Sequence, residues 1–296
     1  MTAVKNYLSL IKFSHTVFAL PFALIGFALG ILSLLSGEDE VEIGSDYYIY
    51  TFLLVLLCMI FARSAAMAFN RYLDRNFDAQ NPRTVIREIP AGVISANSAL
   101  LFTIIMSALF IISTYFINTL CFALSPVALL VVLGYSFTKR FTPLCHLVLG
   151  LGLSLAPIGA YLAVTGIFDL LPVVFSFTVL FWVSGFDIIY ALQDEEFDKK
   201  YQLKSIPVWL GKTKALRVSE VLHVLCALCV VAAGLSGSFG IWYWIGTAIF
   251  IGLLVYQHLL VKPNDLSKVN MAFFTTNGVA SVVFAIFVIV DIVMQG

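Results

Sequence analysis

The stretch NRYLDRNFD, residues 70–78, closes a long apolar run with a short polar segment. Asn70, Asp74 and Asp78 are spaced four residues apart, so on a helix their side chains lie along one face. Of the 296 residues, 61% are hydrophobic and only 11% are charged, whereas a soluble domain carries about 25% charged residues. This composition predicts an integral membrane protein, in which a polar stripe needs a functional reason.

Apolar runs of about 20 residues, the length needed to cross a bilayer, recur along the chain. They predict an all-α bundle of about nine transmembrane helices, at residues 13–35, 47–69, 97–117, 119–137, 145–166, 169–190, 217–236, 240–260 and 271–294. No Pro- or Ser-rich linker divides residues 1–296, so we expect a single domain. The second and sixth runs both end in an aspartate cluster and a charged loop, which indicates a weak internal duplication.

The connections between the runs alternate in charge. Those after the first, third, fifth and seventh runs hold no Lys or Arg, and the first of them is acidic. The basic residues follow the second, fourth, sixth and eighth runs: Arg71, Arg75, Arg83, Arg87, Lys139, Arg140, Lys199, Lys200, Lys204, Lys212, Lys214, Arg217, Lys262 and Lys268. Because basic loops stay in the cytoplasm, we expect the N-terminus and these loops on the cytoplasmic side of the inner membrane.

A second polar cluster follows the sixth run. It consists of Asp187, Tyr190, Asp194 and Asp198. Their separations of three, four and four residues predict a second single helical stripe. Glu195 and Glu196 fall off this stripe and are expected to be solvated. Four membrane crossings separate the two stripes, so both are expected at the same face of the membrane.

Two facing carboxylate stripes repel each other unless a cation neutralises them. Carboxylate and amide oxygens suit Mg²⁺, which binds through a few carboxylates and keeps water and substrate phosphate oxygens. The expected metal ligands are Asn70, Asp74, Asp78, Asp194 and Asp198. Basic side chains nearby can complete a diphosphate site, since arginine grips phosphate with two hydrogen bonds. The stripes therefore indicate a Mg²⁺-bound diphosphate at the membrane surface, with its lipid tail between the helices.

Five further polar residues lie in or beside the apolar runs. Arg63 is inside the second run, where an arginine is costly and usually functional, and it lies seven residues before Asn70 on the same helical face. It is expected to contact substrate or to pair with an aspartate. The four histidines are scattered, and we expect them to be packed or at helix ends, without partners: His15, His146, His223 and His258.

At these residues the sequence resembles the intramembrane aromatic prenyltransferases of the UbiA type, over nearly the whole chain. The first family motif, N-x3-D-x3-D, matches at Asn70–Asp78, and the second, D-x2-Y-x3-D-x3-D, matches at Asp187–Asp198. Four shorter elements also match: N-x-R-T at Asn81–Thr84, P-x-G at Pro90–Gly92, T-K-R at Thr138–Arg140 and K-S-I-P at Lys204–Pro207.

The resemblance implies Mg²⁺-dependent transfer of a polyprenyl group from its diphosphate to an aromatic ring. It implies catalytic roles for Asp74, Asp78, Asp187, Asp194 and Asp198. It implies substrate contacts for Arg63, Asn70, Arg83, Lys139, Arg140, Tyr190 and Lys204. The closest similarity is to 4-hydroxybenzoate polyprenyltransferases of ubiquinone synthesis. Residues 63–71 also resemble a group linked to menaquinone made by the futalosine route, whose acceptor is a dihydroxynaphthoate.

Other functions fit parts of the pattern. Farnesylation of haem or prenylation of a glycerol phosphate would use the same metal site with another acceptor, and a scaffold of lipid metabolism would not need intact motifs. A transporter of an anionic solute is a different class, and its site tends to lie near the membrane midplane on broken helices. The carboxylates here cluster at one face of the membrane, which favours the enzyme.

Overall fold

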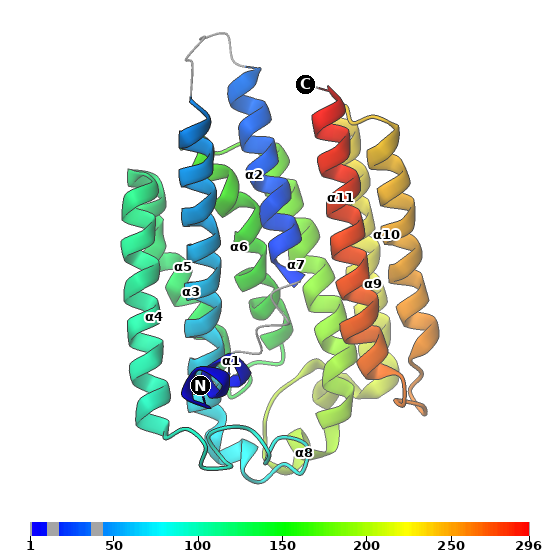
Figure 1. The fold of residues 1–296 in the computed structure, drawn as a ribbon. Helices are drawn as coiled ribbons and strands as arrows, with labels where there is room; N and C mark the ends of the chain where they lie inside the picture. The colour runs from blue at the N-terminus through cyan, green and yellow to red at the C-terminus, as the bar shows by residue number, and fades with distance from the viewer. Residues whose placement is uncertain (1, 11–17, 37–43, 296) are drawn as a thin grey trace.

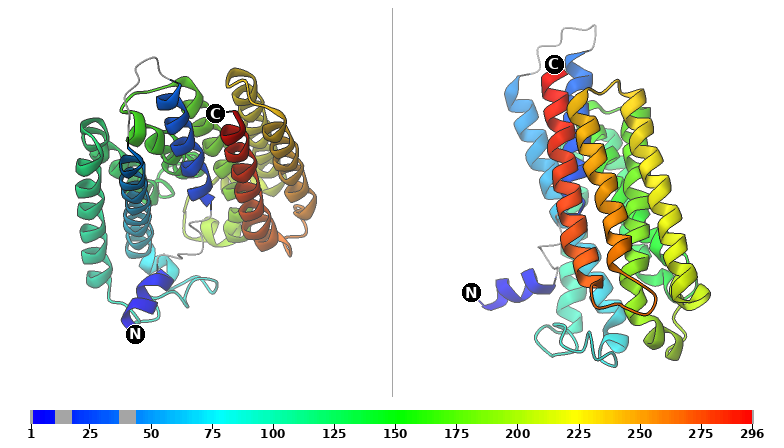
Figure 2. Two further views of the ribbon diagram at one scale, coloured as in Figure 1. Left: turned by 45° about the horizontal axis from the view of Figure 1, so that its top comes forward. Right: turned by 90° about the vertical axis from the view of Figure 1, so that its right-hand side faces the viewer.

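The computed structural model describes residues 2–10, 18–36 and 44–295. Its helices run side by side as one bundle, with the two termini at opposite ends (Figure 1; Figure 2). The elements are α1 (Thr2–Leu10), α2 (Leu20–Leu35), α3 (Ser45–Asp78), α4 (Ala96–Ile117), α5 (Thr119–Thr138), α6 (Cys145–Thr165), α7 (Leu170–Ala191), the 3₁₀ turn η2 (Leu192–Asp194), α8 (Glu195–Lys200), α9 (Ile206–Ser236), α10 (Ile241–Leu260), the π-helical turn η3 (Met271–Thr276) and α11 (Asn277–Gln295).

The predicted all-α membrane bundle is confirmed. Within the described residues, 8 helices are long and apolar enough to cross a membrane, and the 16-residue α2 is a shorter apolar helix. The first predicted run began at residue 13, and its part from 13 to 17 lies outside the described residues, as do His15 and most of the acidic connection that follows α2. The side of the membrane that the N-terminus faces stays a prediction.

Several helices extend beyond their apolar runs. α3 has 34 residues and continues to Asp78, so the whole first stripe is helical. α9 starts at Ile206, ahead of the predicted run, and kinks at Gly211, whose φ of 75° favours glycine. The prediction of one continuous helix for the second stripe is wrong. α7 ends at Ala191, and the tighter turn η2 separates it from α8.

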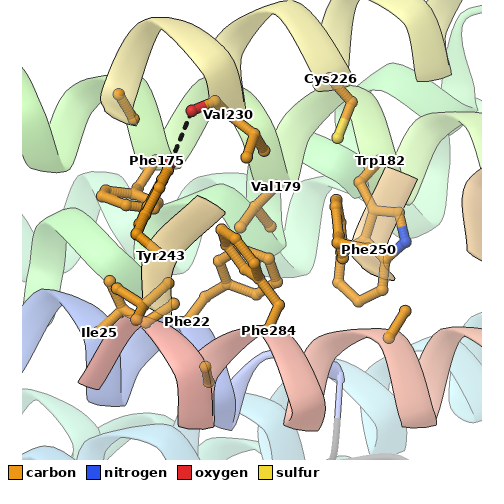
Figure 3. Close-up of a cluster of buried hydrophobic side chains, with 14 of the residues drawn as sticks. Phe22, Ile25, Phe175, Val179, Trp182, Cys226, Val230, Tyr243, Phe250 and Phe284 are labelled. Carbon is orange, nitrogen blue, oxygen red and sulfur yellow. Dashed lines mark hydrogen bonds between the residues drawn. The ribbon is translucent and has the colours of Figure 1, made fainter. Parts of the chain in front are cut away.

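Aromatic side chains fill the contact between α2, α7, α9, α10 and α11 (Figure 3). Tyr243 is fully buried there, and its hydroxyl donates to Val230 O at 2.6 Å, which satisfies a polar group that would be costly in an apolar interior. Further along α2, Gly26 lies directly against α6, since a Cβ at this position would be 2.0 Å from Pro157 O. Small residues at such crossings let membrane helices approach closely.

The carboxylate-bearing ends of α3 and α7 lie at one end of the bundle. α8, the loop after α3 and the loop between α10 and η3 are at this same end as α1, whereas α11 ends at the opposite side (Figure 1). The expectation that both stripes share one face is therefore confirmed, and the loops at this end are the basic ones in the sequence.

Candidate active site

A cavity of about 330 Å³ opens at this end of the bundle. All but one of the predicted site residues line it: Arg63, Asn70, Asp74, Asp78, Arg83, Lys139, Arg140, Asp187, Tyr190, Asp194 and Asp198. Lys204 is the exception. Its side chain is exposed, and its ammonium group donates to Phe141 O at 3.2 Å. These residues come from α3 and the loop after it, the segment that follows α5, and α7, η2 and α8.

The first stripe is held on the inner face of α3 by hydrogen bonds and two arginines. Asn70 Nδ2 donates to Asp74 Oδ2 at 3.0 Å, and Arg140 Nη2 donates to Asp74 Oδ1 at 2.9 Å. Asp78 is only 5% exposed, and its Oδ1 accepts from Arg87 Nη1 at 2.6 Å. Arg87 was counted as a basic loop residue in the sequence but was not expected in the site.

Arg83 lies in the loop after α3, and its side chain contacts two residues of the second stripe. Its Nε donates to Asp194 Oδ1 at 3.1 Å, and its Nη2 pairs with Asp194 Oδ2, so the contact is bidentate. Its Nη1 donates to the Tyr190 hydroxyl at 2.8 Å. Asn81 Nδ2 adds a bond to Asp194 Oδ1 at 3.3 Å. The two aspartate motifs are therefore linked directly by the segment between them.

The other two aspartates of the second stripe, Asp187 and Asp198, also face basic side chains. Lys139 Nζ lies 2.8 Å from Oδ2 of Asp198, which is fully buried. His146 Nδ1 lies 2.7 Å from Asp187 Oδ2, and His146 Nε2 accepts from the Ile206 amide at 3.4 Å. A carboxylate inside a membrane helix needs a partner, and His146 supplies it from 41 residues away in sequence.

Two expectations about charged residues are therefore wrong. The three histidines that the structure describes are not unpaired: His146 faces Asp187, and His223 Nδ1 lies 2.7 Å from His258 Nε2. Glu195 is not solvated, because it is 6% exposed and its Oε1 accepts from Lys199 Nζ at 2.5 Å. These pairings join residues whose spacing in sequence carries no signal, apart from the i, i+4 spacing of Glu195 and Lys199.

The described residues that line the cavity carry slightly more positive than negative charge. Five aspartates line it, and each has a basic partner. The lining also includes Arg63, Arg71, Arg83, Arg87, Lys139 and Arg140, so six cations against five carboxylates leave a formal charge of +1 without histidine. Burial lowers the pKa of Lys139, but Asp198 outweighs this and raises it above its usual value. Burial likewise lowers the pKa of Arg83, but Asp194 and Tyr190 outweigh it, so this pKa is also raised.

The aspartates offer free oxygens to a divalent cation. Among the described residues, no three His, Cys, Asp or Glu side chains form a ready-made metal cluster. Asp78 Oδ2 and Asp198 Oδ1, however, are buried and have no hydrogen-bond partner in the described part of the chain. Buried polar atoms of this kind call for an unseen partner. Hard carboxylate oxygens facing one cavity fit Mg²⁺, which needs only one or two of them beside substrate phosphate.

A second cavity, of about 450 Å³, lies between α3, α4, α5 and α6 and is lined almost entirely by apolar side chains. Five residues line both cavities: Arg63, Met67, Tyr135, Leu149 and Leu153. The polar cavity therefore adjoins an apolar one inside the bundle, and the two share part of their walls. This shape suits an elongated ligand with an anionic head and a hydrocarbon chain.

Comparison with known proteins agrees with this geometry. The model of the UbiA prenyltransferase family matches residues 19–279. The 4-hydroxybenzoate octaprenyltransferase of Aeromonas salmonicida (strain A449) is 30% identical over 236 residues, which is 80% of this chain and 81% of that protein. That of Nitrosospira multiformis is 32% identical over 233 residues, 79% and 80% of the two chains. The chain therefore belongs to the UbiA prenyltransferase family, and the expectation of a prenyl-transferring enzyme is confirmed.

Solved structures share the fold. The apo structure of a UbiA homologue from Aeropyrum pernix K1 has a TM-score of 0.76 and 27% identity, covering 95% of this chain and 98% of that one. A UbiA homologue from Archaeoglobus fulgidus bound to DMAPP and Mg²⁺ has a TM-score of 0.75 and 21% identity, covering 97% and 99%. The arrangement of helices is therefore that of the UbiA membrane proteins.

Proposed function

We propose that this protein transfers a polyprenyl group from polyprenyl diphosphate to an aromatic hydroxy acid of the 4-hydroxybenzoate type, with Mg²⁺ as cofactor. One observation carries the proposal: two carboxylate stripes and six cations meet in a cavity that shares a wall with an apolar one. The names of the relatives, 4-hydroxybenzoate octaprenyltransferases, support this acceptor and a long prenyl donor. The homologue bound to DMAPP and Mg²⁺ supports the metal.

The donor diphosphate is assigned to the polar cavity and its prenyl chain to the apolar cavity. Asn70, Asp74, Asp78, Asp194 and Asp198 are the residues that would hold Mg²⁺. Bound Mg²⁺ would neutralise the charge that develops on the departing diphosphate. A hydrocarbon chain gains about 0.8 kcal/mol for each CH₂ removed from water, so the apolar cavity contributes affinity that depends on chain length.

The cations of the cavity act on the leaving group. Arg83, Lys139 and Arg140 are fixed beside the carboxylates, where they stabilise negative charge as the bond between the prenyl carbon and the diphosphate oxygen breaks. The bonding electrons leave with the diphosphate, and the allylic cation is attacked by a hydroxyl-activated ring carbon. Loss of the ring proton restores aromaticity. The apolar lining keeps water from the cation.

The acceptor is assigned to the junction of the two cavities. Arg63 lines both, on the α3 face that also carries Asn70, and provides a cation for the carboxylate of an aromatic acid. Tyr190, on α7, also lines the polar cavity and is fixed by Arg83. A dihydroxynaphthoate offers the same acid and hydroxyl groups on a larger ring, so it is the second acceptor to test.

We propose in addition that residues 1–296 form a single domain in the cytoplasmic membrane, with the cavity open to the cytoplasm. The support is the charge of the loops at the cavity end, which hold the basic residues of the connections. Labelling of a single introduced cysteine in the loop after α3 by a membrane-impermeant reagent tests this. Labelling in intact cells would contradict the proposed orientation.

The activity is tested on membranes supplied with octaprenyl diphosphate, Mg²⁺ and labelled 4-hydroxybenzoate or dihydroxynaphthoate. We expect a prenylated product with the first acceptor and its loss on addition of EDTA. Asp74→Ala and Asp194→Ala should each abolish turnover while the protein still inserts into the membrane, and Lys262→Ala, on the exposed loop after α10, serves as the control. Product with neither acceptor, or turnover that survives EDTA, would refute the proposal.

A further inference from the structure

A π-helical turn interrupts the last membrane span beside the candidate active site. η3 covers Met271–Thr276, directly ahead of α11. π-Turns are rare and frequently occur at functional sites. This one is stabilised by the residue that follows it: Asn277 Nδ2 donates to Ala272 O at 2.9 Å and to Phe273 O at 3.1 Å. The side chain of Asn277 thus bonds two carbonyls of the turn itself.

Asn277 is anchored in turn by a polar network in the core of the bundle. It is fully buried, and its Oδ1 accepts from Trp182 Nε1 at 2.9 Å. Gln257 Oε1 accepts from Asn277 Nδ2 at 3.3 Å, and Gln257 Nε2 lies 3.4 Å from Nδ1 of His223, the partner of His258. The network joins α7, α9, α10 and α11. Buried polar groups are costly in a membrane protein and usually mark function.

The turn places an aromatic ring on the wall of the active-site cavity. Phe273 lines this cavity and stacks on Tyr190, with ring centroids 4.1 Å apart and an interplanar angle of 28°. It also meets the edge of Phe186, at 5.2 Å and 84°. The hydroxyl of Tyr190 is the group that accepts from Arg83. Phe273 therefore supports the ring of Tyr190 on one face, while Arg83 fixes its hydroxyl.

We propose that Asn277 is a positioning residue for the aromatic acceptor: it holds the π-turn so that Phe273 keeps Tyr190 oriented in the cavity. The inference rests on the proposed function, in which Tyr190 faces the acceptor. Its effect passes through Phe273, because Asn277 itself is not in the cavity lining. Arg83 is also held by a bidentate contact with Asp194 that does not involve Tyr190, so we expect binding of the donor diphosphate to change little.

A double-mutant cycle with Asn277→Leu and Phe273→Leu tests this, with labelled 4-hydroxybenzoate as the acceptor. At saturating donor, we expect each single variant to raise the acceptor KM about tenfold and to leave the donor KM within about twofold. If Asn277 acts through Phe273, the acceptor KM of the double variant should be at most about twofold above that of the single variant with the higher KM. Additive losses, about a hundredfold in the double variant, would overturn the proposal, as would an unchanged acceptor KM in Asn277→Leu.

A matched control separates positioning from general loss of stability. Asp291→Leu also removes a buried polar group of α11, one that accepts from the Gly240 amide at 2.7 Å and the Tyr243 amide at 3.2 Å. It lies 14 residues along the helix from Asn277, about 21 Å away. It should lower the unfolding temperature without raising the acceptor KM. If it raises that KM as much as Asn277→Leu does, the role of Asn277 is purely structural.

Hydrogen–deuterium exchange gives a readout that needs no turnover. Exchange in residues 271–276 should rise in Asn277→Leu and stay at the wild-type level in Asp291→Leu. Asn277→Asp, which keeps the acceptor for Trp182 and loses the amide donor, should show the same rise and replaces Asn277→Leu if that variant does not fold. If the wild type prenylates no acceptor, the proposed function fails. The positioning role is then overturned if hydrogen–deuterium exchange in residues 271–276 is the same in Asn277→Leu as in the wild type.

Discussion

Lys139→Met removes the cation that faces the most deeply buried aspartate of the cavity. Asp198 is 0% exposed, whereas the Lys139 side chain is 34% exposed. Breaking a fully buried ion pair costs about 3–5 kcal/mol and an exposed one about 0–1 kcal/mol. A pair buried on one side falls between these limits, so we expect a loss of roughly 2 kcal/mol. Methionine keeps the apolar stem, which confines the loss to the charge.

The assay is thermal unfolding in detergent, with and without Mg²⁺. A loss of about 2 kcal/mol corresponds to a fall of roughly 4–8 °C. Mg²⁺ bound as proposed would bring positive charge back to Asp198, so it should raise the unfolding temperature of Lys139→Met more than that of the wild type. Lys262→Met, on an exposed loop, should change neither the unfolding temperature nor its response to Mg²⁺. An unfolding temperature of Lys139→Met equal to the wild type, with or without Mg²⁺, would refute the reasoning.

Three further variants test other parts of the structure. Arg83→Lys loses the bidentate contact with Asp194, and kcat/KM for the donor should fall about 10- to 100-fold in the prenylation assay, as one lost charge-assisted bond predicts. Gly159 lines the apolar cavity, and outside its own helix no described atom lies within 4 Å of a Cβ built there. The leucine side chain of Gly159→Leu should therefore take up cavity space and slow octaprenyl transfer more than geranyl transfer. Gly26→Val collides with Pro157 O and should cost about 1–3 kcal/mol of stability, measured by denaturation.

The sequence predicted those parts of the site that follow helical periodicity. Asn70, Asp74 and Asp78 line one face because α3 continues without a break to residue 78. The residues of the second stripe line the same cavity although the 3₁₀ turn η2 interrupts their helix. Regular spacing therefore located both motifs, but did not reveal the break between α7 and α8.

The partners of the aspartates were harder to predict, since they depend on how distant helices pack. His146 is 41 residues from Asp187, and nothing in its local sequence distinguishes it from the other histidines. Lys204 lies within a family motif, yet its side chain turns out of the cavity. Phe273 stood in an apolar run among many phenylalanines, and only the π-turn reveals why it faces Tyr190.

Each described aspartate of the cavity pairs at least one carboxylate oxygen with a basic side chain, so a metal ion that took up a paired oxygen would compete with that side chain. An arginine or lysine displaced in this way would be free to turn to the diphosphate. Each ligand would thus prepare the site for the other, and thermodynamic linkage then requires the donor to tighten Mg²⁺ binding by the same factor as Mg²⁺ tightens donor binding. Such a site would bind Mg²⁺ and the diphosphate more tightly together than either ligand alone.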